Sequence, residues 1–334
     1  MRLGLLMASG AALALMHSTP VAHAQLAYEP PRTSDGRPLL EGHWSNTSLT
    51  VLERPRDLAR LVITEEEARR AAQIRNQMAD QDSQPTDPSA PAPRAGQNVG
   101  GYNQFWIDTG TSFAKIGGQY RSSWLVDPPN GKLPYTEAGK KRFDAAFNQQ
   151  RNATSDPELR SLGERCLLGF GSAAGPPMLN VSYNNNYQIV QTPENVVIFA
   201  EMIHDARVVR VNAPHLPDPM LRWMGDSVGR WEGDTFVVET VNMHPQESTR
   251  VYYGQSFHIS EHARITERLT RISDTQLLYS FEVDDPETYA QTWRAEMVFN
   301  ATAAPSYEYA CHEGNYSMPG ILAGGREEER LAEQ

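Results

Sequence analysis

Short runs of β-branched and aromatic residues alternate with turn signals along the second half of the chain. Within these runs apolar residues recur at every second position, which is the period of a strand with one buried face. Turn signals such as PEN, HD, GD and SD separate the runs and favour hairpins. This pattern predicts strands at 187–192, 196–203, 206–212, 226–232, 235–242, 263–272, 276–283 and 292–299.

Eight short strands in succession are enough to close a small barrel that holds one small ligand. The sequence therefore predicts a mainly β protein in which residues 181–334 form an antiparallel meander, folded as a lipocalin-like barrel or a curved sheet. Periodicity leaves the polar strand faces open: they either face solvent around an apolar core or line an inner, partly polar ligand pocket. For Glu239, placed among valines, a solvated outer face is favoured.

The first half of the chain carries two helix signals. Segment 63–79 (ITEEEARRAAQIRNQMA) offers Thr64 as an N-cap, followed by three glutamates and, further on, by arginines. The helix dipole favours this order of charges. A second short helix is predicted at 136–147 (TEAGKKRFDAAF), with Thr136 at its cap.

Two loops complete the N-terminal part, residues 25–180, which is expected to wrap the barrel. Residues 80–101 (DQDSQPTDPSAPAPRAGQNVGG) have no periodicity and predict a mobile loop. Residues 165–180 (RCLLGFGSAAGPPMLN) form a loop rich in glycine and proline, which allows the backbone to approach another group closely.

The first 24 residues have the pattern of a secretory leader. Arg2 is followed by an apolar stretch and by Ala-His-Ala before Gln25, which is the order of n-region, h-region and cleavage site. The apolar run is too short and too interrupted for a good membrane span, and an uncleaved anchor is the alternative. No later segment is apolar enough to cross a bilayer, so a periplasmic or secreted protein is predicted.

The charge balance bears on the choice of partner. The chain has 41 acidic and 30 basic residues and a formal net charge of −11, which disfavours nucleic acid and anionic membrane surfaces. Hydrophobic residues make up 40% of the chain and six are tryptophans, so a globular protein is expected.

The chain has two cysteines, Cys166 and Cys311. In an oxidising compartment an even count favours a disulfide. A free catalytic thiol and two separate buried thiols are the alternatives.

One candidate for chemistry is the stretch EMIHDARVVR, which places His204 and Asp205 in a predicted tight turn. An imidazole beside a carboxylate is the usual pair for general acid–base catalysis. Neighbouring side chains on an extended strand point to opposite faces, so only a turn brings the two together. Asp205 is equally well explained as an ordinary turn residue.

A second candidate is the stretch CHEGNY, which offers His312, Glu313 and Tyr316. Histidine and glutamate bind metals or exchange protons. The alternative is a polar rim around a structural disulfide. A bridge between Cys311 and Cys166 would hold these side chains beside the glycine-rich loop.

Several common catalytic signatures are missing from the sequence. G-x-S-x-G, Walker A, G-x-G-x-x-G, H-E-x-x-H, C-x-x-C-H and EF-hand patterns do not occur, which disfavours the enzyme classes that depend on them. The predicted loop at 243–262 carries histidines that would line a site beside a barrel mouth, and ordinary surface residues are the alternative for each of them. These are His244, His258 and His262.

Taken together, several stretches resemble a large family of exported bacterial proteins, found in sphingomonads, their relatives and acidobacteria, most of which have no assigned function. The stretches include EMIHDARVVR, GDSVGRWEGDTFVVETVN, VDDPETY and YEYACHEGNYSM. The resemblance implies that these motifs belong to one shared constellation. It therefore favours His204, Asp205, His312 and Glu313 as a joint site.

The sequence favours an exported, cofactor-independent enzyme that acts on a small apolar or aromatic molecule by acid–base chemistry of lyase, isomerase or hydratase type. In this hypothesis His204 is the general base and Asp205 orients it. Glu313 or His312 is the acid.

Two further residues would polarise a substrate oxygen, Tyr316 and Arg165. Two other classes of protein stay open. One is a non-catalytic periplasmic carrier of a hydrophobic compound. The other is a metal-dependent hydrolase with the four residues of the joint site as ligands.

Overall fold

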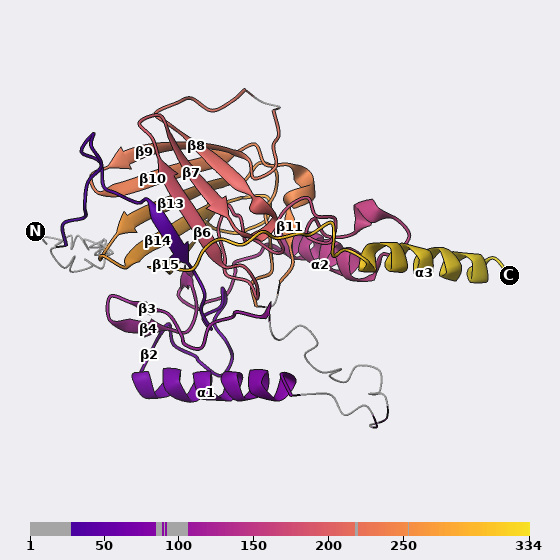
Figure 1. The fold of residues 1–334 in the computed structure, drawn as a ribbon. Helices are drawn as coiled ribbons and strands as arrows, with labels where there is room; N and C mark the ends of the chain where they lie inside the picture. Colours follow the sequence, from indigo (N-terminus) through magenta and orange to yellow (C-terminus); the bar gives the residue numbers. More distant parts are fainter. Residues whose placement is uncertain (1–27, 85–88, 90, 92–105, 218–219, 253) are drawn as a thin grey trace, which may run out of the picture.

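The computed structural model describes residues 28–84, 89, 91, 106–217, 220–252 and 254–334. A closed barrel of nine strands forms the body of the protein (Figure 1). The strands, in their order around the ring, are β1 (Gly42–Ser45), β6 (Asn186–Gln191), β7 (Asn195–Ala200), β8 (Ala206–Val211), β9 (Asp226–Glu232), β10 (Thr235–Val241), β13 (Arg264–Arg271), β14 (Gln276–Asp284) and β15 (Trp293–Ala301). The predicted barrel is confirmed, and all eight predicted strands are present with small shifts at their ends.

The ninth strand, β1, comes from the segment that the sequence assigns to the wrapping part of the chain. It pairs antiparallel with β6 on one side and with β15 on the other, and this closes the ring. Trp44 on β1 is buried, and its indole N–H donates to the carbonyl of Leu40 at 3.0 Å. Another N-terminal strand, β5 (Leu125–Asp127), adds to the free part of β15. The barrel is therefore built from both halves of the chain.

One pair of neighbouring strands corrects the predicted meander. Strands β8 and β9 run parallel, with Arg210 beside Val228. A tight hairpin cannot join parallel strands, so the chain needs a longer crossover between them. Residues 212–225 supply that crossover, and the long gap between the predicted strands 206–212 and 226–232 is its only sequence signal.

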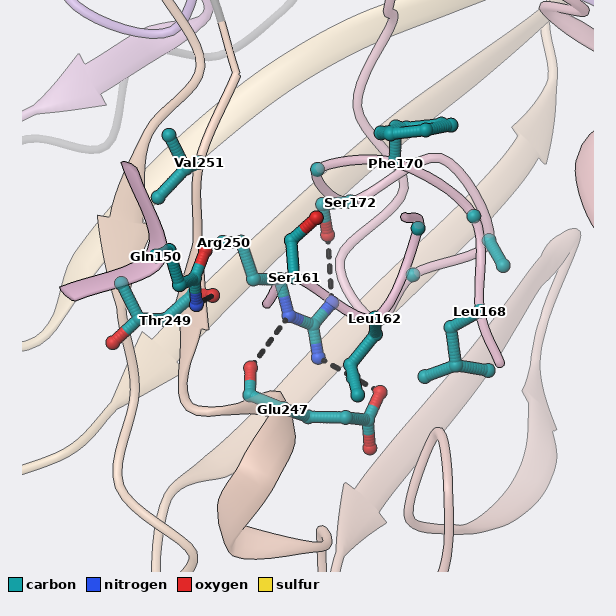
Figure 2. A pocket seen from close by; sticks show the side chains of 15 residues that line it. Gln150, Ser161, Leu162, Leu168, Phe170, Ser172, Glu247, Thr249, Arg250 and Val251 are labelled. Carbon is teal, nitrogen blue, oxygen red and sulfur yellow. Dashed lines mark hydrogen bonds and ion pairs between the residues drawn. The ribbon is translucent and has the colours of Figure 1, made fainter. Parts of the chain in front are cut away.

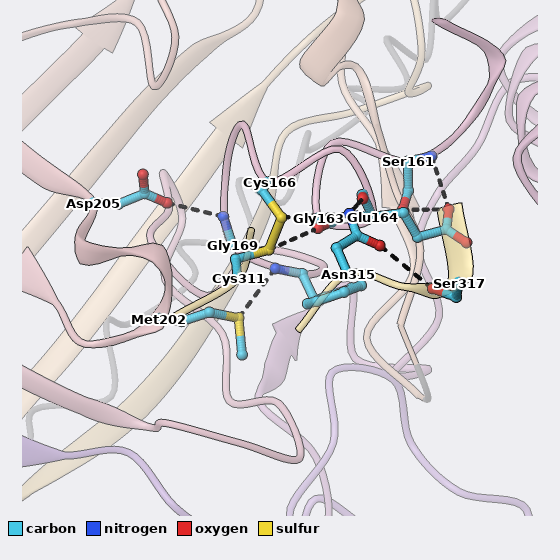
Figure 3. The surroundings of a disulfide bond; sticks show 11 residues. Ser161, Gly163, Glu164, Cys166, Gly169, Met202, Asp205, Cys311, Asn315 and Ser317 are labelled. Atoms are coloured by element: carbon cyan, nitrogen blue, oxygen red, sulfur yellow. Dashed lines mark hydrogen bonds between the residues drawn. A yellow bond between two sulfur atoms is a disulfide. The ribbon is translucent and has the colours of Figure 1, made fainter. Parts of the chain in front are cut away.

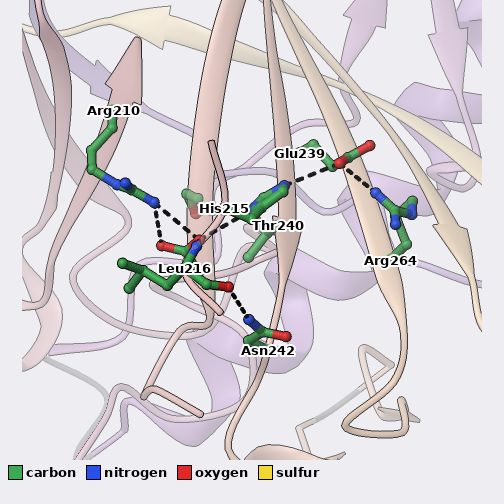
Figure 4. Close-up of polar contacts among 9 residues, drawn as sticks. Arg210, His215, Leu216, Glu239, Thr240, Asn242 and Arg264 are labelled. Atoms are coloured by element: carbon green, nitrogen blue, oxygen red, sulfur yellow. Dashed lines mark hydrogen bonds and ion pairs between the residues drawn. The ribbon is translucent and has the colours of Figure 1, made fainter. Parts of the chain in front are cut away.

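Polar contacts fasten this crossover to the outside of the barrel (Figure 4). The carboxylate of Asp226 accepts the backbone N–H of Leu216 and a guanidinium N–H of Arg210, both at 2.8 Å. His215 lies between the carboxylates of Asp226 and Glu239, with each N···O distance 3.0 Å. Glu239 thus stands on the outer face, as favoured from its position in the sequence.

Aromatic side chains fill the interior of the barrel. Tyr187 stacks on Phe299 with ring centroids 5.1 Å apart, and Tyr279 packs on the same ring at 5.3 Å. Phe281 and Trp293 meet edge to face, and both are buried. The apolar strand faces therefore point inward and form the core. These rings occupy the place where a hollow barrel would hold its ligand.

One ion pair is buried within this interior. Arg207 on β8 faces Glu267 on β13, and their side chains are 3% and 0% exposed. The contact is bidentate, with one N···O distance of 2.8 Å. The hydroxyl of Tyr279 donates to Glu267 at 2.5 Å and accepts the backbone N–H of Met178 at 2.9 Å. This polar chain links three strands to the glycine-rich loop.

Helices lie around the barrel: α1 (Glu65–Asp82), α2 (Glu137–Asn152) and α3 (Ser317–Ala332). Both predicted caps are confirmed, since Thr64 forms a capping box with Glu67 and the Thr136 hydroxyl accepts the Gly139 N–H at 3.0 Å. A small sheet, β2 (Val62–Ile63), β3 (Lys115–Ile116) and β4 (Gln119–Arg121), stands between α1 and the barrel in Figure 1.

Helix α3, which the sequence pattern does not predict, extends away from the barrel in Figure 1. Within the described parts of the chain, no helix has both the length and the apolar character needed to cross a bilayer. The predicted leader lies outside the described residues. So does most of the predicted mobile loop at 80–101, whose first residues instead continue α1.

The buried ion pair yields a prediction about stability. Glu267→Gln leaves the charge of Arg207 without its partner in an apolar interior, which costs about 3–5 kcal/mol. The matched control is Glu282→Gln on the outer face of β14, which should change the free energy of unfolding by about 0.5 kcal/mol or less. Urea unfolding of both variants checks this. If the two variants lost the same free energy of unfolding, the role assigned to the Arg207–Glu267 pair would be wrong.

Candidate functional site

The glycine-rich loop lies against one end of the barrel, and a disulfide ties the C-terminal segment to it (Figure 3). Cys166 and Cys311 are bonded, with their Cα atoms 5.8 Å apart, so the predicted disulfide is confirmed. The side-chain amide of Asn315 donates to the carbonyl of Glu164 at 2.7 Å. Residues 311–315 are therefore held along the loop.

The turn with His204 and Asp205 meets the same loop. The turn is a short 3₁₀ helix, Met202–His204, in which Ile203 has φ 59° and His204 has φ 58°. A β-branched residue in the left-handed region is rare and strained, and such strain is often found at functional sites. The surrounding contacts hold this turn in a costly conformation.

The two predicted catalytic side chains do not hydrogen-bond to each other in the described structure. Each accepts a hydrogen bond from a backbone N–H instead. Asp205 accepts the N–H of Gly169 at 2.9 Å, and His204 Nε2 accepts the N–H of Tyr309 at 3.0 Å. The structure thus brings His204 and Asp205 together with both the glycine-rich loop and the C-terminal segment. The imidazole is oriented by the backbone of Tyr309, where the sequence hypothesis assigns that role to Asp205.

The surroundings of Asp205 shift its protonation. Burial raises the pKa of this carboxyl to about 6, against the opposing effects of the Gly169 N–H and of His204. An apolar cluster adjoins the turn, with Met202 buried at its centre. The side chains packed against this cluster are Phe170, Tyr183, Ile203, Tyr252 and Tyr309. Asp205 is therefore a carboxyl group that changes charge near neutral pH.

The predicted site residues of the C-terminal segment lie at the surface. His312, Glu313 and Tyr316 are exposed, Tyr316 to 85%. In the part of the chain that the structure describes, no three side chains of histidine, cysteine, aspartate and glutamate are grouped to hold a metal ion. The four proposed ligands of a metal-dependent hydrolase are thus not assembled.

A small cavity lies under the glycine-rich loop, and we call it the inner cavity (Figure 2). Its volume is about 40 Å³, which is room for little more than a water molecule or the end of a larger molecule. It is lined by Gln150, Ser161, Leu162, Gly163, Leu168, Gly169, Phe170, Gly171, Ser172, Ala174, Gly175, Glu247, Thr249, Arg250 and Val251.

Two buried charged residues face this cavity, Glu247 at 3% and Arg250 at 5% exposure. The Arg250 guanidinium donates to the Ser172 hydroxyl at 2.7 Å and to the Glu247 carboxylate at 3.4 Å. Its Nε donates to the Glu247 carbonyl at 3.3 Å. Ser172 in turn donates its proton to the carbonyl of Pro177 at 2.5 Å, so its hydroxyl is not set up as a nucleophile.

Opposing effects set the charge of Glu247. Burial raises the pKa of this carboxyl, and nearby Asp205 raises it further, while Arg250 and the N–H of Met224 lower it, with a net rise. Burial also lowers the pKa of Arg250, although an arginine keeps its proton at any physiological pH. The cavity therefore pairs a readily protonated carboxyl with a fixed positive charge.

Sequence reasoning missed Glu247, Arg250 and Ser172. Charged residues in a predicted loop are normally solvated, and nothing in the stretch PQESTR distinguishes these two. The only sequence signal is indirect. The glycine-rich loop was expected to approach some group closely, and Ser172 within it contacts Arg250.

A wider depression opens beside the inner cavity, and we call it the outer groove. Its volume is about 320 Å³. Its lining residues are Ala146, Gln149, Gln150, Glu158, Leu159, Arg160, Leu162, Arg165, Pro245, Gln246, Ser248, Thr249 and His258. Gln150, Leu162 and Thr249 also line the inner cavity, so the two spaces adjoin.

The outer groove contains one of the three loop histidines and one predicted site residue. His258 Nδ1 lies 2.6 Å from the Thr249 hydroxyl. Burial and Arg142 lower the pKa of His258, against the opposing effect of Asp285, so its imidazole is neutral at neutral pH. Arg165 donates to the Gln246 side chain at 3.3 Å.

No protein-family model, curated protein or solved structure matches this chain in the comparisons.

The raised pKa of Asp205 yields a prediction about pH. The folded protein binds this proton more tightly than the unfolded chain does. The carboxyl's contribution to stability is therefore fully present below about pH 4 and lost as pH rises through 6. Asp205→Asn, which keeps an oxygen for the Gly169 N–H, should gain about 1–3 kcal/mol relative to wild type between pH 4 and pH 7.

The measurement is the free energy of urea unfolding at several pH values for wild type, Asp205→Asn and the exposed control Asp156→Asn. The control should follow wild type at every pH. A constant difference between Asp205→Asn and wild type across this range would show that burial does not shift Asp205.

Proposed function

We propose that this protein is an exported enzyme that moves a proton on a small, largely apolar or aromatic molecule, without a bound cofactor. The observation that carries the proposal is the meeting of Glu247 and Arg250 at the inner cavity. A carboxyl with a raised pKa transfers protons efficiently near neutral pH, and a buried guanidinium stabilises negative charge on oxygen. The leader sequence supports export.

Glu247 is the proton-transfer group in this proposal. Its carboxylate removes a proton from a carbon next to a substrate carbonyl, and the electron pair moves onto the carbonyl oxygen. The protonated Glu247 then returns the proton to another carbon, or a leaving group departs from the neighbouring carbon. The first outcome is an isomerisation and the second is a lyase reaction, and water addition is the reverse of an elimination.

Arg250 is the group that holds the developing oxyanion. A guanidinium has five N–H bonds, and in the described residues Ser172 and Glu247 accept three of those of Arg250. The other two have no acceptor among the described residues, and in this proposal they bind a substrate oxygen in the inner cavity. The ion pair also fixes the guanidinium in place before the substrate arrives, which is the condition for electrostatic stabilisation of a transition state.

Asp205 has a supporting role in this scheme. It is bonded to Gly169, which lines the inner cavity, and its charge helps to raise the pKa of Glu247. Leu162, Leu168 and Val251 supply an apolar lining, which suits an apolar substrate end. The cavity accepts only the reacting end of a molecule, so the rest lies outside it.

The packing of the barrel makes the competing carrier hypothesis less favourable. A carrier of lipocalin type binds its ligand inside the barrel. Phe281, Trp293 and Phe299 fill that space, and each is essentially unexposed. The functional site is therefore better sought at the loop-covered end than inside the ring.

The test uses proton exchange, because C–H exchange can be observed before the product is identified. The mature protein is incubated in D₂O with a panel of small aldehydes, ketones and unsaturated carbonyl compounds, and NMR follows C–H exchange and water addition. Glu247→Gln should reduce the rate of any protein-dependent reaction about 100-fold or more. Circular dichroism and thermal unfolding verify that the variant is folded.

Exposed Glu313→Gln provides the matched control, because Glu313 is one of the two candidate acids of the sequence hypothesis and does not line the inner cavity. It should react like wild type. The reverse result, with Glu313→Gln inactive and Glu247→Gln unaffected, would return the site to the C-terminal segment.

A further inference from the structure

We propose that the outer groove binds the carboxylate group of a small organic acid, through Arg165 and the side chain of Gln246 beside His258. This inference rests on the proposed function in one respect: it makes the acid the substrate, with its apolar or aromatic part directed to the inner cavity. The binding itself is testable without turnover.

The first argument is the state of Arg165. Among the described residues its guanidinium has no carboxylate within ion-pair distance, and its one hydrogen bond goes to the neutral Gln246 amide. By contrast, neighbouring Arg160 is paired with Glu164 at 2.5 Å. Arg165 is thus a half-buried cation whose charge no described carboxylate neutralises. Guanidinium groups match carboxylates with two parallel hydrogen bonds.

The second argument is an unsatisfied donor in the same wall. Arg160 lines the outer groove, and its side chain is 9% exposed. Its terminal nitrogens donate to Glu164 and to the carbonyl of Ala153, whereas its Nε is buried without a hydrogen-bond partner in the described structure. Arg160 and Arg165, which both line the groove, thus each keep an N–H that no described residue accepts.

The third argument is that His258, which lines the outer groove, is rigidly held and neutral. The backbone of His258 is fixed on both sides, because its N–H donates to the Tyr135 hydroxyl at 3.1 Å and its carbonyl accepts from Tyr289 at 2.7 Å. Its neutral imidazole adds no charge that would compete for the ligand. The one carboxylate that lines the groove, Glu158, is exposed, so solvent screens its repulsion.

Size and connection then define the ligand class. A volume of about 320 Å³ suits a small molecule rather than a polymer. Amide and hydroxyl groups of Gln149, Ser248 and Thr249 provide polar contacts for the acid end. The shared lining of Gln150 and Leu162 leads to the apolar side chains of the inner cavity. The ligand is therefore a monocarboxylic acid with an apolar or aromatic body.

The test is isothermal titration of the mature protein with acetate, benzoate, hexanoate and 3-phenylpropionate, each beside its neutral amide. At least one acid should bind about ten-fold more tightly than its amide, as expected for a charge-assisted contact. Arg165→Gln should remove this preference, and Arg165→Lys should restore part of it. The control is Arg326→Gln on α3, an exposed arginine outside the groove, which should bind like wild type.

Three results would overturn the inference. One is the absence of any acid that binds more tightly than its amide. Another is an Arg165→Gln variant that keeps the preference. The third is inorganic phosphate that binds as tightly as the best acid and displaces it, which would indicate a general anion site.

Glu247→Gln separates this inference from the proposed function. That variant should still bind the acids more tightly than their amides, since this preference depends on Arg165 and Glu247 does not line the outer groove. Suppose that acid binding depends on Arg165 but that Glu247→Gln leaves the rate of C–H exchange unchanged. The proposed function would then be wrong, and the inference about the outer groove would stand.

Discussion

The fold and the candidate site both depend on one buried ion pair, between Arg207 and Glu267 in the middle of the barrel. Charges in an apolar interior are stable only when they are paired and hydrogen-bonded. Here Tyr279 completes the arrangement, since it donates to Glu267 and accepts the backbone N–H of Met178. The polar groups of the core therefore end in the glycine-rich loop, and this loop forms the roof of the inner cavity.

At the candidate site, too, buried charges are paired with charges of opposite sign. Arg250 and Glu247 form a second buried pair, and the charges of Arg207 and Glu267 act on Arg250. Four buried charged groups thus influence one another across the loop-covered end of the barrel. Such a network rigidifies its surroundings, because moving one member leaves another unsatisfied. A rigid arrangement of charges is also what electrostatic catalysis requires.

Local sequence patterns predicted much of this fold. Alternation in 276–283 identified a strand with one apolar face, and Thr64 marked the start of α1, since each depends only on near neighbours along the chain. Which face points into the barrel was left open, because periodicity does not give a direction. The four residues of β1 were missed because such a short strand has too few positions to show a period. The parallel pairing of β8 and β9 was missed because register across a crossover is a tertiary property.

The candidate site was harder to predict, for a physical reason. Cysteine count gave the disulfide, and the turn at His204 was recognised, but the partners of its side chains are backbone N–H groups, which sequence patterns do not distinguish. Glu247 and Arg250 belong to a stretch that is polar by composition. Their burial follows only from the loop folding over them.

Closure of the ring by β1 and β15 has a consequence for how the protein folds. Trp44 pairs with Ala301, so this seam of the barrel joins segments from opposite parts of the described chain. Contacts between distant residues form only after a large loss of chain entropy, and proteins rich in such contacts fold slowly. Until this seam forms, β1 and β15 are open sheet edges, which are the places where chains join one another and aggregate. Closure of this seam therefore also removes the edges through which one copy of the chain could join another.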